Sequence, residues 1–241
     1  MSFYVAQFDT ITTKAIVLDI DETLINASTD MKLLEMSGIM TDPKLMKFRD
    51  RIGIVKIPDV LAARGSGTRT DLWFVKRPYL REFLIFCFAY FRVVVIWSAG
   101  ADKYVKNIVQ NLFQGIRPPV VTYTRLNSFQ KSPTVFTKPL TKLIAEQPDL
   151  AKFMTLKNTL ILDDKTVSFE NDPNNGVLIP KYDPLTDRKS RVEILSSISM
   201  QDIALLQFKA WLRKPEVECE EDVRNLDKSK IFVTPLDAKS A

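Results

Sequence analysis

The sequence contains no histidine and only two cysteines, Cys87 and Cys219. Without histidine, the chain cannot build a Ser-His-Asp or Cys-His catalytic site, a HExxH zinc site or a phosphohistidine intermediate. Two cysteines are too few for a zinc site and do not make a disulfide framework, which is typical of proteins in a reducing compartment. Any acid–base chemistry must therefore use carboxylate, lysine, tyrosine or cysteine side chains.

The chain also lacks a long apolar run and a strong excess of one charge. Its longest apolar stretch, residues 83–97, is broken by Arg92 and is shorter than the ~20 residues that a membrane span needs. Residues 1–10 contain neither a basic leader nor a long apolar core, so we expect no signal peptide. The sequence thus predicts an intracellular protein, cytoplasmic or nuclear, without a membrane segment.

The net charge is +5, from 34 basic and 29 acidic residues. Such a mild excess permits an anionic substrate without requiring nucleic acid. Residues 216–222 hold five acids and no base, so the rest of the chain is more basic than the total suggests.

Short apolar runs typical of buried strands alternate with segments of helical periodicity. Strands are predicted at 15–18, 92–97, 120–123, 158–162 and 177–179, and helices at 78–90, 103–113 and 199–212. This alternation implies parallel strands joined by right-handed crossovers. The predicted fold is therefore α/β, with a doubly wound, mainly parallel sheet.

Residues 26–70 break the alternation and are predicted to be an insertion, or cap, after the first strand. They include helical pieces near 31–36 and 44–50 and a stretch with two glycines at 64–68. We expect residues 1–213 to form one domain, with 214–241 as an acidic C-terminal tail.

Polar side chains follow three of the predicted strands, and ligands bind at the carboxyl ends of strands in an open parallel sheet. The polar residues at these strand ends are Asp19, Asp21, Ser98, Asp163 and Asp164. Lys138 lies on the segment between the strands that precede Ser98 and Asp163. Four carboxylates in one crevice repel one another unless a cation lies among them. A hard divalent ion with oxygen ligands, Mg²⁺ above all, suits this donor set. Together with a lysine, it would make a phosphate site in which a carboxylate attacks phosphorus.

The segment Val17-Leu18-Asp19-Ile20-Asp21-Glu22-Thr23-Leu24 resembles the first motif of the haloacid-dehalogenase (HAD) superfamily. With glutamate at position 22, the motif is similar to the variant found in the NLI-interacting-factor-like (NIF-like) branch. This branch comprises the phosphatases of the RNA polymerase II C-terminal domain. Residues 76–84, 94–98, 138–140 and 160–177 resemble further segments of that branch. The resemblance runs from about residue 14 to residue 212 and includes all four superfamily motifs. It implies a HAD-like Rossmannoid core.

The resemblance also implies roles for the matching positions. Asp19 would be the nucleophile that forms an aspartyl-phosphate, and Asp21 the general acid and then the general base. Thr23, Ser98, Lys138 and Arg125 would support or bind the phosphate and the substrate. Mg²⁺ would be held by Asp19, the backbone carbonyl of Asp21, Asp164 and Asp163, the last directly or through water.

The expected activity is that of a Mg²⁺-dependent phosphomonoesterase acting on phosphoserine or phosphothreonine in a protein or peptide. Several positions depart from the branch, including Ser98 for threonine, Tyr79 for glycine and Lys165 for serine. The insertion shows no similarity to the one that selects substrate in the small polymerase phosphatases. Two alternatives stay open: a nucleic-acid end phosphatase of the same superfamily, with nucleic acid the less favoured partner, and a non-catalytic binding module. Members of this branch also occur in large DNA viruses, which leaves a viral origin open.

Overall fold

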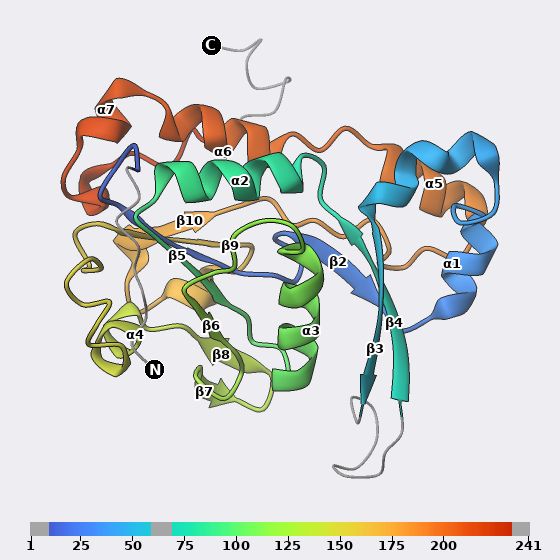
Figure 1. Cartoon of the computed structure of the whole chain (residues 1–241), viewed down its shortest axis with the longest axis horizontal. Helices are drawn as coiled ribbons and strands as arrows, with labels where there is room; N and C mark the ends of the chain where they lie inside the picture. The colour runs from blue at the N-terminus through green and yellow to red at the C-terminus, as the bar shows by residue number, and fades with distance from the viewer. Residues whose placement is uncertain (1–9, 59–68, 233–241) are drawn as a thin grey trace.

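The computed structural model describes residues 10–58 and 69–232 and is built around a five-stranded parallel sheet (Figure 1). The strand order is β10-β9-β1-β5-β6. The bounds are β1 Ala15–Leu18, β5 Val93–Trp97, β6 Val121–Tyr123, β9 Thr159–Asp163 and β10 Gly176–Leu178. Strand β1 lies in the middle, where it pairs with β5 on one side and β9 on the other. The predicted α/β fold with a mainly parallel sheet is therefore confirmed.

Apolar residues cover both faces of this sheet, as expected for parallel strands enclosed by helices. Successive residues of β1 and β5 alternate between two hydrophobic clusters, one on each face. Helices α2 (Leu80–Tyr90), α3 (Asp102–Leu112) and α6 (Ala204–Leu212) cover the first face. Helix α4 (Leu140–Glu146) and the segment after it cover the second. This packing fixes the strand ends that carry the polar residues.

A second, antiparallel sheet lies between β1 and α2 in the sequence and was not predicted. Its order is β2-β4-β3, with bounds β2 Ile25–Ser28, β3 Ile52–Pro58 and β4 Arg69–Lys76. We call it the cap sheet; it projects beside the main sheet in Figure 1. The two helical pieces predicted here are α1 (Met31–Ser37) and the 3₁₀ helix η1 (Pro43–Arg51). The stretch 64–68 lies outside the described residues.

The helix predicted at 199–212 ends at Leu212 as expected but begins five residues later than predicted, because residues 200–203 are not helical. Helix α5 (Arg191–Ser199) packs against α1, and α6 begins only at Ala204. Asp202 lies in the break between the two helices, where its carboxylate pairs with buried Arg77 at 2.9 Å and also accepts a hydrogen bond from the Ala204 amide.

The acidic segment packs on the core as far as residue 232. It contains α7 (Pro215–Cys219) and a 3₁₀ turn η4 (Val223–Asn225), and it buries Val217, Val223 and Ile231 in the first hydrophobic cluster. Residues 1–9 and 233–241 of the predicted domain and tail lie outside the described residues, so the division at 213 stays a prediction. Among the described residues, no helix has the length and apolar character to cross a membrane.

Candidate active site

Asp19 follows directly after β1 and lies at the centre of a buried polar cluster. The neighbouring strand holds its backbone, because the Asp19 amide donates to the Leu162 carbonyl of β9 at 3.0 Å. Its side chain is almost fully buried. The carboxyl ends of β1, β5 and β9 meet at this edge of the sheet, as the sequence predicts.

Lys138 lies between the carboxylates of Asp19 and Asp163. Its Nζ is 2.5 Å from Asp19 Oδ1 and 2.5 Å from Asp163 Oδ2, and all three side chains are buried. The backbone amide of Lys138 donates to the Ser168 carbonyl, and Pro139 directly after it precedes α4. The lysine is thereby held on a short, fixed segment, and its ammonium neutralises part of the acidic cluster.

Asp19, Asp163 and Asp164 form a group whose carboxylate oxygens lie within 4.8 Å of one another. Both Asp163 oxygens are occupied, one by Lys138 and the other by the Lys165 amide at 2.9 Å. Asp164 differs: its backbone amide donates to Thr23 Oγ1, whereas its buried Oδ1 has no hydrogen-bond partner among the described residues. Three close carboxylates with one free buried oxygen suit a hard, oxygen-preferring divalent cation.

The pKa values in the cluster reflect burial and crowding. Burial raises the pKa of Asp19 against the opposing charge of Lys138, and it raises the pKa of Asp164 to about 6. Although burial acts to lower the pKa of Lys138, the carboxylates of Asp163 and Asp19 raise it above its ordinary value. One ammonium does not balance this many carboxylates, so a bound cation would relieve the repulsion.

Asp21, two residues after Asp19, is held by two hydroxyl groups. Ser98 Oγ donates to Asp21 Oδ2 at 3.2 Å, and the Tyr104 hydroxyl donates to Oδ1. Ser98 is fully buried and also accepts the Gly100 amide at 3.0 Å, so its hydroxyl contacts a carboxylate and a backbone amide. Burial raises the pKa of Asp21. Two hydroxyl donors thus fix the orientation of this carboxylate.

These groups open into a cavity of about 320 Å³ lined by Asp19, Asp21, Lys138, Asp163 and Asp164. Residues 134–136, at the start of β8 (Val135–Thr137), also line it; β8 pairs with β7 (Phe129–Ser132) in a hairpin that was not predicted.

The structure thus brings together the predicted aspartates and Lys138, and it places Arg125 at the cavity rim. There the guanidinium donates to the Ala99 carbonyl at 2.7 Å and lies over the Phe136 ring. Thr23 and Ser98 are buried behind the cavity and are not among its lining residues.

Sequence reasoning missed Tyr104 and the role of Lys165. Tyr104 comes six residues after Ser98, in the first turn of α3, and its position in an apolar helical pattern hid its hydroxyl. Lys165 Nζ lies 3.0 Å from Glu22 Oε2 and 4.0 Å from Asp164 Oδ2, so a second positive charge lies beside the acidic group. A lysine directly after paired aspartates was the available signal.

This chain is similar to a known protein family and to solved structures of the same fold. The family model described as NLI interacting factor-like phosphatase matches residues 14–211. Two solved structures are similar in fold. One is Fcp1, described as an essential RNA polymerase II CTD phosphatase, with a TM-score of 0.55 and 18% identity over 89% of this chain. The other is a fission yeast Fcp1 variant bound to beryllium fluoride, with a TM-score of 0.52 and 16% identity over 85% of this chain.

The chain covers 58% and 56% of those two solved chains, so it corresponds to a little over half of their length. No curated protein sequence matches it.

Proposed function

Because the chain belongs to the NLI interacting factor-like phosphatase family, we propose that it hydrolyses phosphoserine or phosphothreonine esters in proteins through an aspartyl-phosphate. The observation that carries this proposal is the buried set of Asp19, Lys138, Asp163 and Asp164 at the strand ends, with Asp21 beside it. The sequence pattern predicts this set, and the cavity above it is open to a phosphate group.

The donor set fits Mg²⁺, which Asp19 and Asp164 would hold, with Asp163 close behind them. When bound, the ion would neutralise phosphate oxygens. The free, buried Oδ1 of Asp164 supports this assignment. Because Lys138 and Lys165 already occupy both Asp163 oxygens, we assign Asp163 mainly to the positioning of Lys138.

The protein's own residues supply the two chemical steps. In the first, the Asp19 carboxylate attacks phosphorus, the bond to the serine oxygen breaks, and protonated Asp21 gives its proton to that oxygen. In the second, Asp21 takes a proton from water, which attacks the aspartyl-phosphate and releases phosphate and free Asp19. Lys138 stays beside Asp19 throughout and balances negative charge. Ser98 and Tyr104 hold Asp21 between the steps.

A substrate panel tests the proposal. Purified protein with Mg²⁺ is assayed at physiological salt on phosphoserine peptides, on oligonucleotides with 3′- or 5′-phosphates, and on an aryl phosphate. We expect the highest kcat/KM on phosphopeptides. The comparison requires this salt concentration because electrostatic binding to nucleic acid weakens steeply as salt rises.

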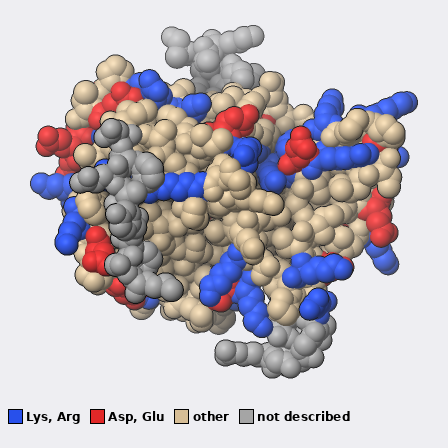
Figure 2. All heavy atoms as spheres, in the orientation of Figure 1, with Lys and Arg blue, Asp and Glu red and all other residues tan. Residues whose placement is uncertain are grey.

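The two alternatives are outcomes of the same panel. A tenfold or greater preference for an oligonucleotide end would replace the protein substrate with nucleic acid. Failure on every phosphate ester would favour a binding module without catalysis. On the face shown in Figure 2, basic side chains occur in separate groups with acidic ones among them, unlike a continuous basic groove for one strand. A cytoplasmic or nuclear location stays a prediction.

A further inference from the structure

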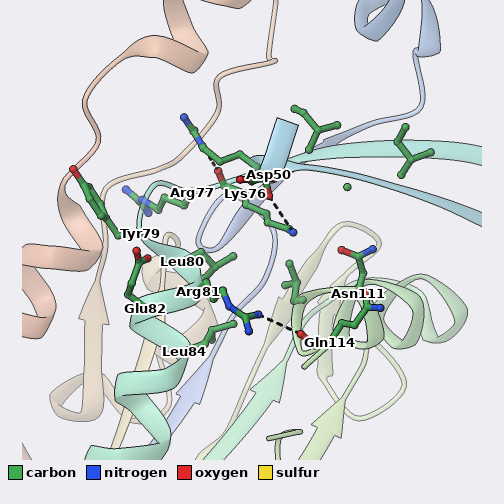
Figure 3. Close-up of a pocket in the computed structure, with 15 residues that line it drawn as sticks. Asp50, Lys76, Arg77, Tyr79, Leu80, Arg81, Glu82, Leu84, Asn111 and Gln114 are labelled. Carbon is green, nitrogen blue, oxygen red and sulfur yellow. Dashed lines mark hydrogen bonds between the residues drawn. The ribbon is translucent and has the colours of Figure 1, made fainter. Parts of the chain in front are cut away.

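A second cavity, larger than the catalytic one, lies where the cap sheet meets the core (Figure 3). Its volume is about 650 Å³. It is lined by residues 50–54 at the start of β3, by the junction of β4 with α2, and by the last turn of α3. It shares no lining residue with the catalytic cavity, so it is a separate space.

Two cations face this space without a carboxylate partner. Figure 3 shows the Lys76 ammonium and the Arg81 guanidinium on the side that faces Asn111 of α3 and Gln114 in the turn after this helix. Lys76 Nζ donates to the Asp50 carbonyl at 3.3 Å, and Arg81 donates to the carbonyls of Gln114 and Gly115 at 3.3 and 3.4 Å. These are long bonds to neutral acceptors. In the part of the chain that the structure describes, no carboxylate lies within ion-pair distance of either cation.

The other charged residues of the lining do not cancel the positive charge of Lys76 and Arg81. Arg77 is neutralised by Asp202, and Arg51 is bonded to two carbonyls and a tyrosine hydroxyl. The acidic lining residues, Asp50 and Glu82, are both exposed, and Figure 3 shows Glu82 on the side of Tyr79. Burial lowers the pKa of Lys76, Asp50 partly opposes this, and the nearby Arg81 charge lowers the pKa further. The lining therefore carries a net positive charge: once Arg77 is paired with Asp202, the three cations Arg51, Lys76 and Arg81 remain against the two carboxylates of Asp50 and Glu82.

One face of α3 continues from this cavity towards the catalytic centre. Asn107, Gln110, Asn111 and Gln114 recur at helical spacing and, with Val55 of β3, line a further cavity of about 290 Å³. Asn111 and Gln114 line both cavities, so the two are contiguous. Side-chain amides both donate and accept hydrogen bonds, which suits the main chain of a bound peptide. We call this surface between α3 and β3 the amide groove.

The two ends of α3 connect the catalytic centre with the cation pair. Tyr104 in its first turn bonds to Asp21, and Asn111 near its end lines the second cavity. Seven residues of helix span roughly 10 Å, and the whole helix roughly 16 Å. An extended peptide advances ~3.3 Å per residue, so about three to five residues cover this distance.

We propose that the amide groove binds an extended segment of the phosphoprotein substrate, with an acidic group of that segment, carboxylate or phosphate, held between Lys76 and Arg81. This inference rests on the proposed function, because the bound segment continues from the phosphorylated residue in the catalytic cavity. It makes the enzyme selective for substrates that carry a second acidic group about three to five residues from the phosphorylated one.

Peptide pairs test this directly. Each pair carries one phosphoserine and differs only in glutamate or glutamine placed three, four or five residues before or after it. Affinity is measured by fluorescence anisotropy on the full-length Asp19→Asn variant with Mg²⁺, so that no turnover occurs. At one spacing, we expect the glutamate peptide to bind about five- to tenfold more tightly, as a charge-assisted contact would give. Phosphoserine in place of that glutamate should bind at least as well.

The same pairs are then measured on Asp19→Asn combined with Arg81→Gln, and on a matched control combined with Lys32→Gln. Arg81 and Lys32 are both exposed, so neither change should unfold the protein. The preference should fall below twofold with Arg81→Gln and persist with Lys32→Gln. Equal affinities at every spacing, or a preference that survives Arg81→Gln, would overturn the inference. Turnover of the same peptides by the unmodified protein is measured separately, in order to distinguish the phosphatase activity from the binding preference. Absence of hydrolysis would count against the proposed function and not against the binding of an acidic group by the amide groove.

Discussion

At the scale of single residues, the site depends on a division of labour between two neighbouring aspartates. The Asp19 carboxylate accepts a hydrogen bond from the Lys138 ammonium. Within the described residues, the side-chain donors to the Asp21 carboxylate are hydroxyl groups only. The fixed ammonium beside Asp19 opposes the effect of burial on its pKa and favours the ionised form that attacks phosphorus. A carboxylate held by neutral donors suits proton transfer. The geometry therefore supports distinct roles that substitutions can separate.

Asp19→Asn should abolish turnover of every phosphate ester, because an amide is a poor nucleophile. Asp21→Asn should stop the reaction of phosphoserine, whose alkoxide needs a proton in order to leave. A nitrophenolate leaves without that proton, so the aryl ester should give a burst of about one nitrophenol per enzyme and then stall. General acid–base groups contribute ~10²–10⁴-fold. Rapid-mixing measurements decide the point, and equal loss on both substrates without a burst would exclude Asp21 as the acid.

Tyr104→Phe removes one of the two hydroxyl donors to Asp21 and leaves the buried ring in place. We expect kcat on a phosphoserine peptide to fall about tenfold, in line with the loss of one hydrogen bond to a charged group, with little change in KM. The aryl phosphate should be affected less, because its leaving group needs the proton less. Tyr123→Phe is a matched control, since its hydroxyl bonds to Glu146 outside the catalytic cavity. Equal losses on both substrates would contradict a role in positioning Asp21.

At the scale of elements, the cap sheet depends on a close approach between two strands. Gly53 of β3 lies opposite Phe74 of β4, and a Cβ atom at Gly53 would lie 2.0 Å from the phenyl ring. The ring is fully buried in the first hydrophobic cluster, so it must shift within packed surroundings to admit a methyl group. Glycine is therefore required here by packing, at the point where the cap sheet joins the second cavity.

Gly53→Ala should lower the free energy of unfolding by about 1–3 kcal/mol, the usual result of overpacking a well-filled core. The measurement is a urea or guanidinium titration that compares the variant with the unmodified protein. Ile54→Ala, at the exposed neighbouring position of the same strand, is the control and should have a much smaller effect. Comparable losses in the two variants would indicate that β3 tolerates a side chain at Gly53.

The sequence was most informative about the elements that carry the site. β-branched runs that end in aspartate predicted β1 and β9, and the parallel arrangement then placed Asp19 and Asp163 together. The cap sheet escaped prediction because the predicted insertion ended at residue 70 and residues 71–76 were assigned to no strand, and because the pairing of residues 69–76 with 25–28 and 52–58 is non-local. The second cavity likewise arises from three separate segments, which no local pattern reveals.

At the scale of the whole molecule, the stability of the fold depends on the repulsion among the carboxylates of Asp19, Asp163 and Asp164, which a bound cation would reduce. Mg²⁺ should raise the melting temperature, since it binds the folded site and not the unfolded chain. Chelation should abolish turnover, and added Mg²⁺ should restore it. The Asp164→Asn variant should lose most of the Mg²⁺-dependent shift, measured by scanning calorimetry without any substrate. Full activity in excess chelator, or an unchanged shift in Asp164→Asn, would contradict the assignment of the metal site.

The central position of β1 also has a consequence for how the chain reaches its folded state. One edge of β1 pairs with β5, which begins at Val93, whereas its other edge pairs with β9, which begins only at Thr159. Contacts between segments so far apart in sequence form slowly, because a long loop must close before they gain stability. During synthesis from the N-terminus, one edge of this apolar strand therefore stays unpaired until β9 has left the ribosome. An unpaired apolar edge is a site of aggregation, so the nascent chain is most vulnerable during that interval.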